Sequence, residues 1–290
     1  MSILNRRSAR TATTALTLLV ALTGCSAGRG QSPPPVDTSE GVGHVHAVAT
    51  NMGADTGTYV ATHTGLYLVG EEGLVRVGET RSDLMSFTVI GPDTFLASGH
   101  PAPGEGGPSS LGLIRSTDAG LTWAEVSLGG ESDFHALTAV DERIYGLDAT
   151  TSTLRWSTDQ GTRWQEGAQI TAADLDADPA APDRVLATTP DGLMLSADGG
   201  ATFARTHETP EPLVLIDHVT TGAGSVLLGL DAAGVLWREL PRGWRSMGPG
   251  IGTPEAFWAL DEQTLTASAD GAVHRSTDGG ATWSVIATID

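Results

Sequence analysis

The feature that most constrains the fold of this chain is an eight-residue motif, close to Ser-x-Asp-x-Gly-x-Thr-Trp, that occurs four times. The copies lie at residues 116–123, 157–164, 196–203 and 276–283. The first three start 41 and 39 residues apart, and the last starts 80 residues further on. A fixed period near 40 residues predicts an architecture of repeated units, each of which packs against its neighbours.

Each copy of the motif reads as a hairpin turn between two short strands. An Asp in such a turn accepts backbone N–H bonds, and Gly adopts a positive φ without steric cost. The terminal aromatic side chain is large enough to pack between neighbouring sheets. We therefore interpret the motif residues as structural and not catalytic: Asp118, Trp123, Asp159, Trp164, Asp198, Phe203, Asp278 and Trp283.

The same period divides the chain into six units, each with four short strand-like runs. We place these units at residues 44–79, 83–129, 133–170, 171–209, 213–250 and 254–289. The second unit carries an insertion, 100–108, that we expect to form a surface loop, and the fifth keeps the period without a clear motif. Units of this kind predict an all-β, six-bladed β-propeller of four-stranded antiparallel blades. A solenoid is the alternative, but neither end of the chain reads as a capping repeat.

The eight-residue motif resembles the Asp-box, or BNR repeat, of sialidases, sortilin-type receptors and related β-propellers. That resemblance implies that each box lies between the third and fourth strands of a blade, away from the binding face. Segments 44–46, 62–67, 97–101 and 111–118 further resemble bacterial secreted propellers labelled glycosyl hydrolase or exo-alpha-sialidase. The sialidase Arg triad is not identifiable, because Arg115, Arg155 and Arg275 are expected on third strands. The likeness to sialidases is thus one of scaffold, which does not fix function.

The first residues read as a targeting segment. Arg6, Arg7 and Arg10 precede an apolar run, 11–22, that is too short to span a bilayer, and Thr23-Gly24-Cys25 follows. This arrangement resembles a bacterial lipobox, which implies a lipoprotein signal peptide at 1–24 and acylation of Cys25. We expect a flexible tether at 25–43, a propeller at 44–290 and an extracytoplasmic location, lipid-anchored to the cell membrane. An ordinary secretory signal with an incidental Cys is the alternative.

The charge of the chain argues against nucleic acid as a partner. Once the signal segment is removed, 13 Arg remain against 35 acidic residues, a formal charge of −22. Such a surface repels phosphate backbones. We expect a monomer whose partner, besides the membrane, is a small ligand, a glycan or an envelope protein.

Histidines gather at one end of three adjacent units. The resemblance to propellers implies that first strands begin, and second strands end, at the mouth of a central channel. By that topology the mouth holds His44, His46, His63, His100 and His135, and the carboxylate of Asp148 lies nearby. Imidazole suits transition metals such as Zn or Cu, so these residues are candidate metal or ligand-binding residues. The alternative is a polar channel whose histidines bond to water and backbone carbonyls.

Three functions follow from these observations. The first is a membrane-anchored propeller that binds a ligand or metal ion at the His-lined mouth without catalysis. The second is a glycoside hydrolase that uses carboxylates at the mouth, although no catalytic residue can be named. The third is an envelope scaffold that binds a protein through the loop around 100–110.

Overall fold

The computed structural model describes residues 41–53, 56–206 and 209–289. The predicted signal peptide, the acylation site Cys25 and most of the predicted tether lie outside these residues. These features therefore stay predictions. No helix among the described residues is long and apolar enough to cross a membrane.

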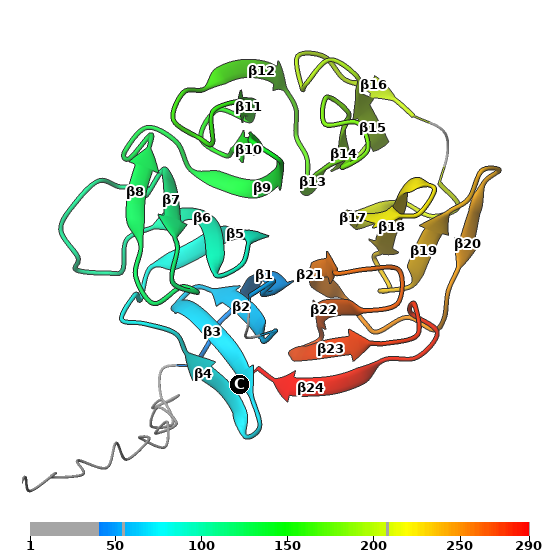
Figure 1. Ribbon diagram of the computed structural model, residues 1–290, viewed down its shortest axis with the longest axis horizontal. Coiled ribbons are helices and arrows are strands. Elements are labelled where there is room, and N and C mark those ends of the chain that lie inside the picture. Colours follow the sequence, from blue (N-terminus) through cyan, green and yellow to red (C-terminus); the bar gives the residue numbers. More distant parts are fainter. Residues whose placement is uncertain (1–40, 54–55, 207–208, 290) are drawn as a thin grey trace, which may run out of the picture. The chain divides into compact units, whose positions relative to one another are not determined.

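The described residues form six four-stranded antiparallel sheets, which we call blades one to six (Figure 1). Within every blade the strands pair in chain order. The strands of the first three blades are β1 (Val45–Thr50), β2 (Thr58–Thr62), β3 (Gly65–Gly70), β4 (Gly73–Arg76), β5 (Asp83–Gly91), β6 (Thr94–His100), β7 (Leu113–Ser116), β8 (Ala124–Ser127), β9 (Phe134–Val140), β10 (Arg143–Asp148), β11 (Thr153–Ser157) and β12 (Gln165–Gln169). Those of the last three are β13 (Asp174–Ala177), β14 (Val185–Thr189), β15 (Gly192–Ser196), β16 (Ala204–Arg205), β17 (Leu213–Thr221), β18 (Gly224–Asp231), β19 (Leu236–Glu239), β20 (Trp244–Ser246), β21 (Pro254–Ala259), β22 (Leu265–Ala269), β23 (Ala272–Ser276) and β24 (Ser284–Thr288).

The first strand of each blade lies against the first strands of both neighbours. These contacts run from β1 through β5, β9, β13, β17 and β21 and return to β1, so the blades close into a ring (Figure 1). The predicted six-bladed β-propeller is confirmed, and the fifth blade is present although its motif is incomplete.

Apolar side chains between adjacent blades hold the ring together. Tyr59 of blade one packs edge-on against Phe95 of blade two, with ring centroids 4.9 Å apart. Blades one and six close the ring through a core that joins Val45 and Val60 to Val273. Val42, which the sequence places in the tether, is buried in this same core. The packed domain therefore includes at least two residues before His44.

The Asp-boxes lie between third and fourth strands, as the resemblance implied. In blade two, Asp118 Oδ1 accepts the N–H of Thr122 at 2.9 Å. Ser116 Oγ accepts the N–H of Gly120 at 2.8 Å and donates to Asp118 at 2.7 Å. The other three boxes repeat this pattern. The motif's Ser is thus as much a part of the turn as its Asp.

Each box also contacts the preceding blade through its glycine. Gly161 has a φ of 87°, and a Cβ at this position would lie 2.2 Å from Cδ2 of Leu113 in blade two. The box aromatic packs against the same core as Leu113. The ring centroid of Trp164 lies 4.8 Å from that of Phe134 in this core. All four box aromatics pack against interblade cores.

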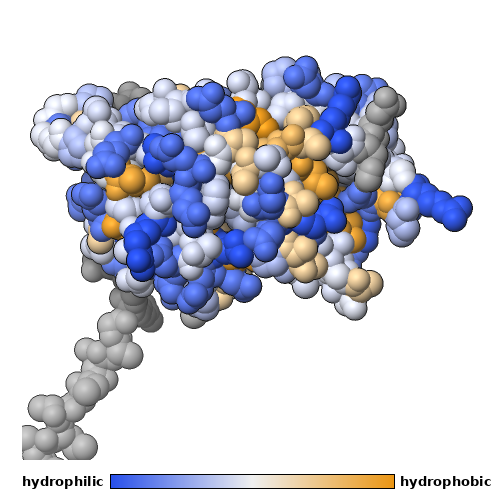
Figure 2. Space-filling model, turned by 90° about the horizontal axis from the view of Figure 1, so that it is seen from above, coloured by the Kyte–Doolittle hydropathy of each residue, from blue (hydrophilic) through white to orange (hydrophobic). Residues whose placement is uncertain are grey.

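The fourth strands form the outer edge of the blades and are largely exposed, as in β12 and β16. Figure 2 shows this edge from above the view of Figure 1. Hydrophilic side chains predominate there, with apolar side chains in smaller areas between them. The side of the ring in Figure 2 is therefore a mainly polar surface.

Candidate functional site

A β-bulge occurs near the start of the innermost strand in blades one, two, three, five and six, and in three of them the extra residue is a histidine or a glutamate. His46 is the unpaired residue between Val45 and Ala47 of β1. His135 has the same position in β9, and Glu255 has it in β21. A bulge bends the strand and re-aims the side chain of its extra residue. In blades one, three and six, the bulge therefore places one histidine or one carboxylate at the channel mouth.

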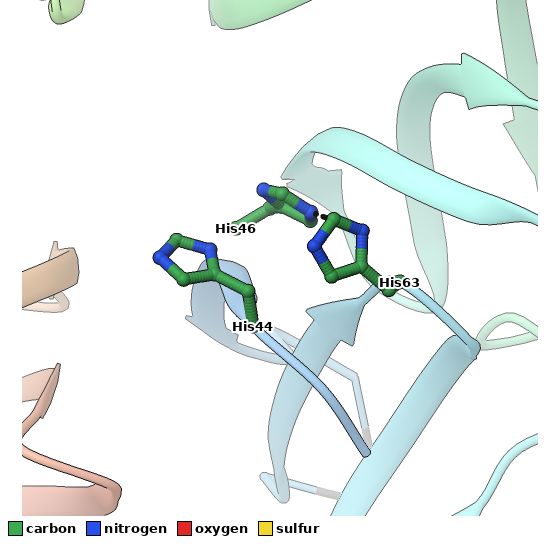
Figure 3. A group of neighbouring side chains, drawn as sticks. All are labelled: His44, His46 and His63. Atoms are coloured by element: carbon green, nitrogen blue, oxygen red, sulfur yellow. Dashed lines mark hydrogen bonds between the residues drawn. The ribbon is translucent and has the colours of Figure 1, made fainter. Parts of the chain in front are cut away.

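Three histidines of blade one come together at this mouth, and we call them the trihistidine group: His44, His46 and His63 (Figure 3). One ring nitrogen from each lies within 4.8 Å of the other two. His46 Nε2 is 3.2 Å from His63 Nδ1, and the His44 ring lies beside that of His46 at a centroid distance of 5.1 Å. His44 precedes β1 and His63 follows β2, so the antiparallel pairing of the two strands brings them together.

Two carboxylates from other blades adjoin the trihistidine group. Asp83, the first residue of β5 in blade two, places Oδ1 3.3 Å from His46 Nε2 and Oδ2 3.0 Å from His63 Nδ1. Glu255 of blade six places Oε1 3.6 Å from His44 Nε2. Neither residue was predicted from the sequence. Both lie at the start of a first strand, where the prediction rested on histidine alone.

Burial governs the protonation of His46, whose side chain is 10% exposed. Removal from water lowers the pKa of His46 to about 4, and the neighbouring His63 and His44 add to this effect against the opposing charge of Asp83. His46 is therefore neutral at pH 7, which is the form of imidazole that binds metals.

A second group joins blades two and three: His100, Asp133 and His135. His100 ends β6, Asp133 precedes β9, and His135 is the bulge residue of β9. His135 Nε2 lies 2.8 Å from Asp133 Oδ2. That hydrogen bond raises the pKa of His135, although burial acts in the opposite direction. The two groups thus differ in their bulge histidines, because the pKa of His46 is lowered and that of His135 is raised.

The structure brings together the five predicted histidines, but as two groups, and it gives Asp148 other partners. The Asp148 side chain is fully buried. Its Oδ1 accepts bonds from the Thr150 hydroxyl at 2.6 Å and the Thr150 N–H at 3.0 Å, and its Oδ2 lies 3.2 Å from Arg155 Nε. Among the described residues, the carboxylate grouped with His100 and His135 is Asp133.

The channel below the mouth is a cavity of about 340 Å³ lined by the innermost strands, with His46 and His135 among its walls. No Arg or Tyr is among the described residues that line it. A set of acidic residues lines it as well: Asp174, Asp176 and Asp217. Burial raises the pKa of Asp174 to about 7, and burial together with the charge of Asp176 raises the pKa of Asp217 well above its usual range.

His218 also lines this cavity. Its Nδ1 is hydrogen-bonded to Asp176. Burial opposes protonation of His218, but the bond and charge of Asp176 outweigh it, so the pKa of His218 is raised. The acidic residues are tied to the next blade by backbone bonds, since Asp174 accepts from Ile216 N–H at 2.8 Å and Asp217 from Ala259 N–H at 2.7 Å. They therefore help to fix the ring of blades.

Comparison with known proteins shows the fold. No family model and no curated protein matches the sequence. The structure is similar to the GH74 enzyme of Niastella koreensis, with a TM-score of 0.60 and 16% identity, over 84% of this chain and 45% of that enzyme. It is also similar to YCF48 from Cyanidioschyzon merolae, with a TM-score of 0.51 and 14% identity, over 86% of this chain and 87% of that one. YCF48 bound to a D1 peptide gives a TM-score of 0.52 at 14% identity, over 84% of this chain and 81% of that one.

At 16% identity or less, these similarities show the fold alone. The chain spans less than half the length of the GH74 enzyme. At such identities the shared feature is the propeller, and propellers carry unrelated functions. The functional assignment must therefore come from the residues at the channel mouth.

Proposed function

We propose that this chain is an extracytoplasmic, lipid-anchored β-propeller that binds a transition metal ion, Zn or Cu, through the trihistidine group, without catalysis. The observation that carries the proposal is the approach of three imidazole nitrogens, from His44, His46 and His63, to within 4.8 Å of one another. Three imidazoles with a further open position form a known set for Zn, and imidazole also suits Cu.

Two features of the surroundings support this assignment. His46 is buried and neutral, so a metal ion need not displace a proton from it at pH 7. Asp83 contributes a negative charge beside both His46 and His63. Its Oδ1 is buried and makes no hydrogen bond, which leaves a lone pair available to an ion or to a ligand of that ion.

The test is metal binding by the full-length chain after removal of metal with a chelator. We expect Zn²⁺ or Cu²⁺ to bind by calorimetry, and the His46→Ala/His63→Ala variant to lose at least about 100-fold in affinity for that ion, more than loss of an outer-shell partner costs. His274→Ala is the matched control, because His274 lies on β23 outside the group. Equal affinity in the double variant and the control would refute the proposal.

A glycoside hydrolase is the second candidate, and the acidic residues of the channel favour it. A carboxyl group with a pKa of about 7, such as Asp174, is still partly protonated at neutral pH, as a general acid must be. Turnover of aryl-glycosides that is lost in Asp174→Ala would support this function. The channel gives no support to sialidase chemistry, since its described lining holds no Arg.

A protein-binding scaffold is the third candidate. It draws on the likeness to YCF48, which has been solved with a D1 peptide. The insertion of blade two adjoins the site, because the backbone carbonyl of Ser109 lies 3.1 Å from His100 Nδ1. Capture of an envelope protein that is lost when residues 102–108 are replaced by a short Gly-Ser linker would support this function.

A further inference from the structure

The hydrogen bonds within the group formed by His100, Asp133 and His135 leave one of its polar atoms without a partner. Asp133 Oδ2 lies 2.8 Å from His135 Nε2 and 3.3 Å from His100 Nε2. Two imidazoles from two different blades therefore converge on a single carboxylate oxygen. The other oxygen, Oδ1, is buried and has no hydrogen-bond partner, and only 8% of the Asp133 side chain is exposed. A buried carboxylate oxygen without a partner is costly, so a water molecule or an ion is expected beside it.

The second ring nitrogen of His100 fixes which atom faces Asp133. His100 Nδ1 lies 3.1 Å from the backbone carbonyl of Ser109. A carbonyl only accepts, so Nδ1 carries the proton and donates it. In the neutral ring Nε2 then presents a lone pair to Asp133 Oδ2, and two acceptors face one another. A cation must lie between them, either a proton on His100 or a metal ion. Donation of the second ring N–H to a backbone carbonyl is also the usual arrangement of a metal-bound histidine.

The group is open to an entering ion. The side chains of His100 and His135 are 41% and 40% exposed, while the carboxylate between them is buried. An ion can therefore arrive from solvent and reach a charged ligand at the base of the site. Two imidazoles and one carboxylate leave further positions open, a set that suits Fe(II) and Zn.

We propose that His100, Asp133 and His135 form a second metal site, independent of the trihistidine group, which binds a divalent transition metal through two imidazoles and one carboxylate. The two sites share no residue. His46 and His135 line the same cavity, so the channel mouth would hold two ions with different ligand sets.

The experiment is a count of bound zinc by mass spectrometry on the metal-depleted full-length chain, reloaded with Zn²⁺ and freed of excess metal. We expect two zinc ions per wild-type chain and two in the His274→Ala control. The His100→Ala/His135→Ala variant should bind one, and Asp133→Asn should weaken the second ion by at least about tenfold. An unchanged count and affinity in both of these variants would overturn the proposal.

The same count separates this inference from the proposed function. If the trihistidine group binds no metal but the second site does, the wild type binds one zinc, which only the His100 and His135 changes remove. If the opposite holds, the one zinc is lost in His46→Ala/His63→Ala alone, and the second site is refuted. His100→Gln gives a milder variant that keeps a donor toward Ser109, and circular dichroism melting of each variant shows whether a lost ion reflects a lost fold.

Discussion

Asp83 of blade two lies against His46 of blade one, with Asp83 Oδ1 3.3 Å from His46 Nε2. The contact joins the start of β5 to the bulge of β1, two segments that the chain separates by a whole blade. The nitrogen that Asp83 approaches is also the one that lies 3.2 Å from His63. The carboxylate is thus aimed at the point where the imidazoles of the trihistidine group converge.

This relationship predicts that Asp83→Asn weakens metal binding without abolishing it. The change keeps the shape of the side chain and removes the negative charge beside two of the three imidazoles. We expect a loss of about 10- to 100-fold in affinity for Zn²⁺ or Cu²⁺, the range for groups that hold metal ligands in place. Calorimetric titration measures it, with Asp93→Asn, which is remote from the mouth in the β5–β6 turn, as the control. Wild-type affinity in Asp83→Asn would show that its carboxylate does not act on the ion.

Asp148→Ala should destabilise the fold and leave the metal count unchanged. Its carboxylate is fully buried and bonds to Thr150 and Arg155, so its removal takes the buried partner from the Arg155 guanidinium, which is only 18% exposed and keeps only the exposed carboxylate of Glu166. Breaking a buried pair costs about 3 to 5 kcal/mol. Urea denaturation measures the loss. If the variant has native stability but binds fewer ions, Asp148 is part of the metal site.

Most of the fold was predictable from the sequence because the Asp-box is a local device. Ser116 and Asp118 close their turn with bonds to residues no more than four positions away, so the motif signals the hairpin wherever it occurs. Blade five, without a clear box, was predictable because its neighbours fix the period. The motif does not predict packing between blades, such as the contact between Gly161 and Leu113 of the preceding blade.

The site was predictable only in part. The topology placed five histidines at one end of the blades, but it could not say which side chains the bulges would turn inward. Glu255 lies at the mouth because β21 has an extra residue there, and one residue changes the face on which a strand side chain lies. Asp148 ends its strand as predicted, yet its carboxylate accepts a hydrogen bond from Thr150, two residues further along the chain. The positions of strand ends alone do not predict such local hydrogen bonds.

Gly161→Ala should destabilise the ring at the contact between blades two and three. The residue has a φ of 87°, and the added methyl would meet Leu113 at 2.2 Å. Left-handed strain and overpacking together should cost about 2 to 5 kcal/mol. Gly222→Ala is the matched control, since a Cβ there meets no atom within 4 Å. Chemical denaturation measures both, and equal stability of the two variants would contradict the proposed role of the box glycine.

The acidic residues of the channel predict that stability falls as pH rises from about 5 to about 8. The folded-state pKa of Asp174, about 7, and that of Asp217 are raised, so the native chain holds protons that the unfolded chain has lost. Their stabilising effect is complete below the unfolded pKa near 3.8 and is lost as pH rises through the folded values. The raised pKa of His218 acts in the same direction, whereas the pKa of His46, lowered to about 4 from 6.5, opposes the decline only between these two pH values. Box residues such as Asp198, whose pKa is lowered to about 2 by bonds from Thr202, contribute the opposite slope only in stronger acid.

Asp217→Asn should flatten this decline. The amide oxygen can still accept the Ala259 N–H that Asp217 accepts at 2.7 Å, but the side chain no longer ionises. Thermal melting in a chelator at pH 5, 6, 7 and 8 measures the slope without interference from bound metal. Asp191→Asn, in the exposed turn between β14 and β15, is the control and should keep the wild-type slope. If Asp217→Asn loses stability with pH as steeply as the wild type, ionisation of Asp217 is not what weakens the ring.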